Sequence, residues 1–213
     1  MKRFNLTSSA FAFIFLFLVA SCKKETATFT LSGILTDETL NQKLAGATIR
    51  LYSVPIGTSD QNLISSSTIG NDGHYSFTFP RDKTEKYIIL VQKSGYFDIN
   101  KEVYFSDLSI EHETIRNYST TAIAWVKLNF VNTAPASVND HLQVMKQAGK
   151  KDCAACCTNS EINLYGIVDS SLVFVNDGNT LFSYLYFVLG TSDQGLKSVV
   201  TTPFDTTELS LYY

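Results

Sequence analysis

The sequence is short of the residues on which most enzymes and nucleic-acid-binding proteins depend. It has only three histidines and one tryptophan, and charged residues make up 17% of it, against about 25% in a typical soluble protein. The formal net charge is −3, so no basic excess neutralises phosphates and nucleic acid is not an expected partner. No P-loop, His-Glu-x-x-His, dinucleotide fingerprint or nucleophile elbow occurs in it. We therefore expect a non-catalytic protein without a cofactor or metal.

Proline is also scarce, with 4 residues against 15 phenylalanines and 11 tyrosines, and hydrophobic residues make up 45% of the chain. A disordered protein needs low hydrophobicity and high charge, so this composition excludes disorder. No amphipathic helix of any length is apparent. Instead, short runs of alternating apolar and polar residues recur between Gly, Asn, Asp and Ser, a pattern typical of strands and turns. The expected fold class is all-β.

The strand-like runs fall into two groups, which predict two consecutive β-sandwich domains. Residues 75–79 in the first half and 123–131 in the second alternate most cleanly, with apolar side chains on one face. In chain order we expect a first sandwich at 27–106, a linker at 107–117 and a second sandwich at 118–213.

The N-terminus carries the most specific signal in the sequence. Lys2 and Arg3 precede an unbroken apolar run from Ala10 to Ala20, which is too short to span a bilayer, since a spanning helix needs about 20 residues. This layout is typical of a secretory signal peptide. The run ends in Leu-Val-Ala-Ser-Cys at 18–22, which resembles the lipobox of bacterial lipoproteins. The alternative is a plain signal peptide with a cysteine there by accident.

The lipobox resemblance implies cleavage before Cys22, with 1–21 as signal peptide and 22–26 as anchor and short linker. It also implies that Cys22 is the lipid attachment site, carrying several acyl chains such as palmitate, which anchor a protein stably where one chain does not. Lys-Lys-Glu at 23–25 resembles surface-export tags of Bacteroidota lipoproteins, and no aspartate follows Cys22 as an inner-membrane retention signal. We expect a lipid-anchored outer-membrane protein, with the periplasmic and cell-surface faces both open.

Four motifs follow one another in the first half. They are Ser-Gly-Ile-Leu-Thr-Asp at 32–37, Leu-Ala-Gly-Ala-Thr-Ile-Arg-Leu at 44–51, Asn-Asp-Gly-His-Tyr-Ser-Phe at 71–77 and Lys-Ser-Gly-Tyr at 93–96. This order resembles the carboxypeptidase regulatory-like domain, a transthyretin-like β-sandwich, over 27–106. Such domains occur beside carboxypeptidases, on outer-membrane receptors and alone in lipoproteins. The resemblance therefore implies a non-catalytic accessory role.

Three further cysteines stand together in Cys-Ala-Ala-Cys-Cys at 153–157. In the oxidising cell envelope we expect a disulfide from Cys153 to Cys156 or Cys157. A bond between the adjacent Cys156 and Cys157 is an alternative. A zinc site completed by His141 is another, although the second pair of cysteines that such sites usually have is missing.

Aromatic side chains give the strongest remaining indication of binding. Trp125 shares its strand face with Lys127 and Asn129, so it should point outward. Tyr184 and Tyr186 lie on a run, 181–189, that is apolar on both faces. Such a run is either the centre of a sandwich or a partly exposed strand. In the second case Trp125, Tyr184 and Tyr186 form a candidate platform for sugar rings or a protein partner.

Together these features predict a non-catalytic, lipid-anchored envelope or surface protein that acts as an accessory binding or adhesion module. Two alternatives remain open. One is a carbohydrate-binding lipoprotein of a glycan-uptake system, and the other is a structural or assembly partner of an outer-membrane receptor. The expected partners are the membrane, through Cys22, and either a glycan or an outer-membrane protein.

Overall fold

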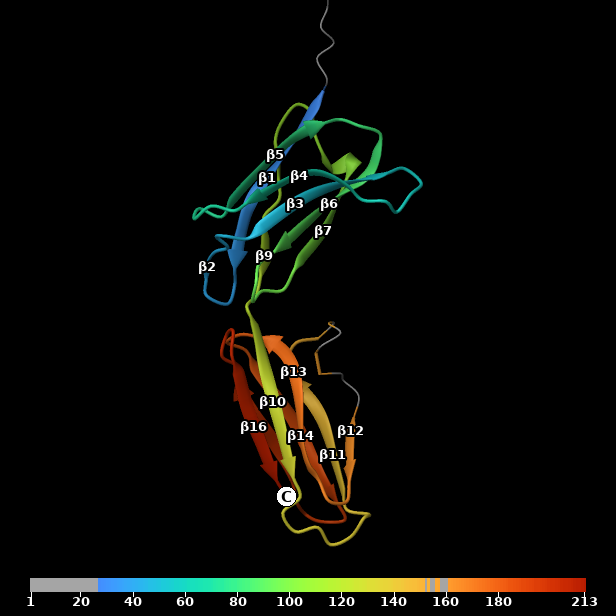
Figure 1. Ribbon diagram of the computed structural model, residues 1–213, viewed down its shortest axis with the longest axis vertical. Helices are drawn as coiled ribbons and strands as arrows, with labels where there is room; N and C mark the ends of the chain where they lie inside the picture. Colours follow the sequence, from blue (N-terminus) through green and yellow to red (C-terminus); the bar gives the residue numbers. More distant parts are fainter. Residues whose placement is uncertain (1–26, 152, 154–155, 158–160) are drawn as a thin grey trace, which may run out of the picture.

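The structure is a computed structural model that describes residues 27–151, 153, 156–157 and 161–213 (Figure 1). The predicted signal peptide and Cys22 lie outside these residues. The described part of the chain forms strands β1 to β16 and one short 3-10 turn, η1 (Phe105–Asp107). No helix within the described ranges has the length and apolar character needed to cross a membrane. The predicted all-β fold is therefore confirmed.

Two sheets build the sandwich of the first half (Figure 1). In one, β1 pairs with β2 and β5 and also with the short β8 and β9; the bounds are β1 (Thr28–Asp37), β2 (Gln42–Lys43), β5 (His74–Pro80), β8 (Thr114–Ile115) and β9 (Tyr118–Thr120). The other sheet has the order β4 (Asn62–Thr68), β3 (Thr48–Pro55), β6 (Thr84–Gln92) and β7 (Ile99–Tyr104), with antiparallel neighbours.

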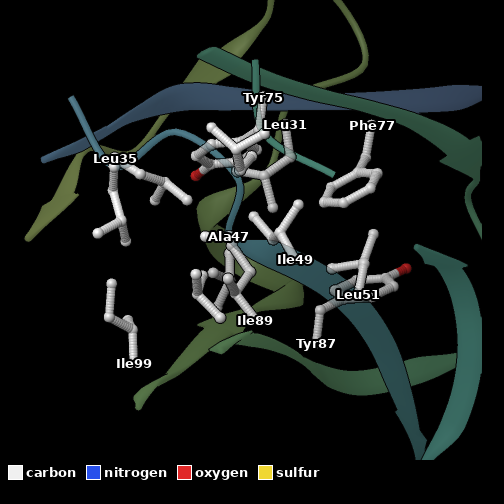
Figure 2. Packing of buried hydrophobic residues seen from close by; sticks show 14 of the residues in the cluster. Leu31, Leu35, Ala47, Ile49, Leu51, Tyr75, Phe77, Tyr87, Ile89 and Ile99 are labelled. Atoms are coloured by element: carbon white, nitrogen blue, oxygen red, sulfur yellow. The ribbon is translucent and has the colours of Figure 1, made fainter. Parts of the chain in front are cut away.

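The core of this sandwich follows from the alternation of its strands, because successive side chains of a strand point to opposite faces. Tyr75, Phe77 and Phe79 of β5 are all buried. Figure 2 shows side chains of β1 and β5 facing those of β3 and β6 across the core. The Phe79 ring lies 4.9 Å from the Tyr87 ring, centroid to centroid, so aromatic contacts join the two sheets.

The segment expected to be a linker, 107–117, is partly paired to the first sheet. β8 and β9 run parallel to β1, and between them the backbone N–H of Arg116 donates to the Ser32 carbonyl at 2.7 Å. This close approach requires Gly33, because a Cβ there would lie 1.8 Å from the Arg116 carbonyl oxygen. The end of the expected linker is thus held on β1, and the division of the chain into domains at these residues stays a prediction.

The second half forms another pair of sheets. β10 (Ile123–Val131) pairs antiparallel with β13 (Asp169–Asp177) and parallel with β16 (Thr206–Tyr212). The facing sheet has the order β12 (Ile162–Tyr165), β11 (His141–Ala148), β14 (Leu181–Leu189) and β15 (Gln194–Val200). Val126, Leu128 and Phe130 of β10 are buried, as the alternation predicts, and they share a core with Phe182 and Tyr184 of β14.

Candidate functional site

Trp125 lies where the sequence pattern places it, on the outer face of the β13-β10-β16 sheet. Its chain neighbours Ala124 and Val126 are buried, whereas Trp125 is half-buried. Further along the same face, the Lys127 ammonium lies 3.0 Å from Glu208, and this carboxylate also accepts a hydrogen bond from the Asn129 amide. Val173, which pairs with Lys127, is 57% exposed, so this face carries both polar and apolar side chains beyond the tryptophan.

Tyr184 and Tyr186 do not form the expected platform with Trp125. Tyr184 is only 1% exposed, and its ring meets the Phe130 ring edge-on at 5.8 Å. Tyr186 packs against the same core, and its hydroxyl hydrogen-bonds Asp193 at 3.1 Å. Burial raises the pKa of Tyr184. The platform prediction is wrong because even-numbered side chains of β14 turn inward, on the sheet opposite Trp125.

The cysteine cluster is closed by a disulfide between Cys153 and Cys156, with the two Cα atoms 5.3 Å apart. Cys157 is buried in the second core, and that burial raises the pKa of its thiol. The Lys146 ammonium donates to the carbonyls of Cys157 and Lys150, which ties this loop to β11. Cys153 and Cys156 are consumed in the disulfide and so are not available as zinc ligands.

The histidines occupy three separate sites. His74 is exposed at the start of β5, and its backbone N–H donates to the Asp72 carboxylate. The Nδ1 atom of His112 shares a hydrogen bond with the Ser109 hydroxyl. The His141 ring stacks on Tyr165 with 4.2 Å between the ring centroids. Across the described residues, no three His, Cys, Asp or Glu side chains gather as a metal site would require.

The two sandwiches meet in a junction that the sequence analysis missed. The Ile123 backbone N–H donates to the Gly95 carbonyl at 2.7 Å, so β10 begins directly against the β6–β7 turn. The rings of Tyr96 and Phe204 pack edge-on with centroids 5.3 Å apart. The Asn179 side-chain amide donates to the Thr39 carbonyl at 3.2 Å. Polar and aromatic contacts therefore both join the two halves.

Lys150 adds an electrostatic contact to this junction. Its ammonium lies 2.6 Å from the Asp177 carboxylate and 3.9 Å from the centre of the Phe97 ring. Both members of the ion pair are about four-fifths buried, with side chains 22% and 20% exposed. A cation over an aromatic ring contributes about 0.5–2 kcal/mol, with the larger values at desolvated sites. Lys150 therefore links an acidic side chain of the second half to a ring of the first.

A cleft of about 340 Å³ opens beside Lys150. Its lining includes Glu38, Asp98, Lys101 and Thr121 as well as the Phe97 ring. Glu38 accepts a hydrogen bond from the Ser119 hydroxyl. Because the lining mixes both charge signs and its Glu38 is already engaged, the cleft does not select a ligand of one charge.

Replacing Lys150 with alanine removes both the ion pair with Asp177 and the contact with Phe97. The junction should therefore loosen, while both sandwiches should stay folded. The measurement is the distance distribution between one spin label in each sandwich, recorded by double electron–electron resonance. The distribution should broaden in Lys150→Ala. The neighbouring Lys151 is exposed, and Lys151→Ala should leave the distribution unchanged. Equal distributions in both variants would refute a role for Lys150 in the junction.

Comparisons with known proteins identify no family for this chain. No protein family matches the chain, and no curated protein matches it significantly. Solved structures that resemble it include the TIE protein of Bacillus anthracis, at 12% identity and a TM-score of 0.37 over 87% of this chain. This chain spans only 34% of that protein's length.

Two other resemblances cover most of both chains. One is to the minor pilin GBS52 of Streptococcus agalactiae, at 10% identity and a TM-score of 0.34, over 86% of this chain and 94% of the pilin. The other is to a DUF3823 family protein of Parabacteroides merdae, at 14% identity and a TM-score of 0.33, over 84% of this chain and 100% of that one. Likenesses of this strength support no conclusion about function.

Proposed function

We propose that the chain is a non-catalytic, lipid-anchored envelope protein that acts as an accessory binding or adhesion module at the cell surface. The observation that carries this proposal is the succession of a lipobox-like N-terminus and two β-sandwiches in tandem. Cys22 would hold the protein in the outer membrane, and the sandwiches would supply the binding surface.

The geometry supports this division of roles. Four residues separate Cys22 from Ala27, the first described residue, and an extended chain covers at most about 3.5 Å per residue. An acyl anchor would therefore lie within about 20 Å of the start of β1. That end of β1 points away from the second sandwich (Figure 1). The second sandwich would then be presented to partners on the side far from the membrane.

The local contacts of two of the histidines are compatible with a non-catalytic protein. His112 and His141 are engaged with Ser109 and Asn163 in separate parts of the fold. General acid–base and nucleophilic catalysis need such groups to converge within hydrogen-bond reach of one another. Binding by a preformed surface needs no such convergence of histidines, so these separate contacts are compatible with it.

Protease treatment of intact cells tests the proposal. Cells that produce the full chain are treated with proteinase K, and the protein is followed by immunoblotting beside a periplasmic marker that reports cell integrity. The proposal predicts digestion of the protein while the marker stays intact. Protection of the protein in sealed cells, with digestion after lysis, would overturn the surface-adhesion role.

A further inference from the structure

The outward-facing side chains of the β12-β11-β14-β15 sheet form rows that have no role in the core. In the β12-β11-β14-β15 sheet, Leu142, Val144 and Tyr184 point into the core, so the side chains between them point outward. The strand registers place outward residues of all four strands in one row, Asn163, Gln143, Phe187 and Gln194. The row on one side of it holds Tyr165, His141 and Leu189, and the row on the other side holds the apolar side chains of Met145, Leu185 and Leu196. We call the seven residues of the first two rows the amide face.

The aromatic part of the amide face is held in a fixed orientation. The Tyr165 and His141 rings are inclined by only 21°, and the Nε2 atom of His141 lies 2.7 Å from the Asn163 side-chain oxygen. Tyr165 is nevertheless 61% exposed. Within the part of the chain that the structure describes, its strand pairs only with β11, so no further described strand of this sheet lies beyond the ring. The His141 ring covers one face of the Tyr165 ring. The other face, held in a fixed orientation, is a stacking surface that loses little conformational entropy on binding.

The polar part of the amide face suits hydroxyl groups. A side-chain amide both donates and accepts hydrogen bonds, as a hydroxyl does. The Gln143 amide nitrogen already donates to Glu161 at 2.9 Å, which orients its carbonyl oxygen as an acceptor. Asn163 and Gln194 are exposed at the two sides of the row. Any partner that buries these amides has to hydrogen-bond them, because an unmatched amide costs about 1–3 kcal/mol, and sugar hydroxyls can both donate and accept.

The charge of this surface restricts the ligand further. None of the seven side chains of the amide face is a carboxylate, a lysine or an arginine. The adjoining Glu161 carboxylate adds negative charge at its margin. An anionic polymer would therefore meet repulsion without a compensating cation, whereas a neutral one would not.

From these contacts we propose that the amide face binds a neutral glycan chain. Sugar rings stack on Tyr165 and Phe187, and their hydroxyls exchange hydrogen bonds with Asn163, Gln143 and Gln194. Tyr165 and Phe187 stand two strands and one row apart, about 12 Å between Cα atoms, so the site fits a chain of sugars rather than a single one. This inference rests on the proposed binding role and supplies its ligand class. It uses the face of β14 opposite to Tyr184 and Tyr186.

Affinity electrophoresis tests the proposal. The protein, purified in detergent from cells that produce the full chain, is run in native gels that contain laminarin, xylan, mannan, dextran, starch or alginate. The proposal predicts retardation by at least one of the five neutral polysaccharides and none by the anionic alginate. Tyr165→Ala should weaken that retardation about tenfold in apparent Kd, because it removes the stacking ring. Tyr165→Phe keeps the ring and should preserve it.

Trp125→Ala is the matched control, since Trp125 is a half-buried aromatic residue on the opposite sheet and should not affect retardation. Circular dichroism checks that each variant is folded. The proposal is overturned if no neutral polysaccharide retards the protein, if alginate does so equally, or if Tyr165→Ala leaves retardation unchanged. Any of these results beside a positive surface-protease experiment would refute the glycan site and leave the surface role standing.

Discussion

Replacing Phe130 with alanine should lower the free energy of unfolding of the second sandwich by about 3–5 kcal/mol. Phe130 is completely buried, and its ring contacts Tyr184 across the core. It lies on β10, which is paired with β13 on one side and β16 on the other. Because these pairings hold the backbone on both sides, the strand cannot shift inward to fill the cavity.

Urea unfolding followed by circular dichroism measures this loss. Phe130→Leu keeps most of the apolar volume and should cost less than about 1.5 kcal/mol. Lys127→Ala removes only an exposed ion pair with Glu208 on the other face of β10, and it should change stability by less than about 1 kcal/mol. A loss for Phe130→Ala as small as that for Lys127→Ala would show that the two sheets do not pack here as described.

Gly33→Ala should destabilise the first sandwich by about 1–3 kcal/mol or more. The added Cβ would lie 1.8 Å from the Arg116 carbonyl oxygen, so either β1 or the segment carrying β8 and β9 would have to move. The shift would also weaken two hydrogen bonds, from the Arg116 N–H to Ser32 and from the Ile34 N–H to Asn117. Hydrogen exchange should therefore become faster at the amides of Ile34 and Arg116.

Gly70→Ala is the matched control for this effect. A Cβ at Gly70 meets only the Asp72 side-chain oxygen, at 3.2 Å, and this flexible group can turn away. We expect little change in either stability or hydrogen exchange. If Gly33→Ala behaves like Gly70→Ala, the segment 114–120 does not lie as close to β1 at Gly33 as described.

The strands that alternate cleanly could be predicted from the sequence. The odd-numbered residues Tyr75, Phe77 and Phe79 are buried, and so are Val126, Leu128 and Phe130 among the even-numbered residues of β10. In both runs the polar residues between the apolar ones determine which face is buried. The period-2 pattern then sets the strand and its orientation together.

The buried face of β14 could not be predicted from the alternation of its residues. Leu181, Leu185 and Phe187 make its second face apolar too, so the pattern alone could not decide which side faces the core. The decision comes from non-local pairing with β11, whose Leu142 and Val144 are buried. The same pairing brings Gln143 beside Phe187, and this is why the amide face had no recognisable signal in the sequence.

The contacts around the junction also could not be predicted from the sequence, because they are non-local. β8 and β9 are too short to show alternation, and they pair with β1 in parallel at a distance of about 80 residues along the chain. Lys150 and Phe97 are far apart in the sequence, although their side chains are in contact. Phe204 adopts a positive φ of 64°, a backbone conformation that is not expected for phenylalanine. Contacts of this kind are set by tertiary packing.

The lipobox-like sequence and the regulatory-like domain rest on short motifs and stay predictions. The account depends most on Cys22, because a surface module needs its anchor. The most direct test is metabolic labelling of cells with an alkyne analogue of palmitate, followed by purification of the full-chain product and mass spectrometry of its N-terminal peptide. The account predicts label on a peptide that begins at Cys22, with label and membrane retention both lost in Cys22→Ala. An unlabelled N-terminus, or a Cys22→Ala variant that stays in the membrane fraction, would contradict it.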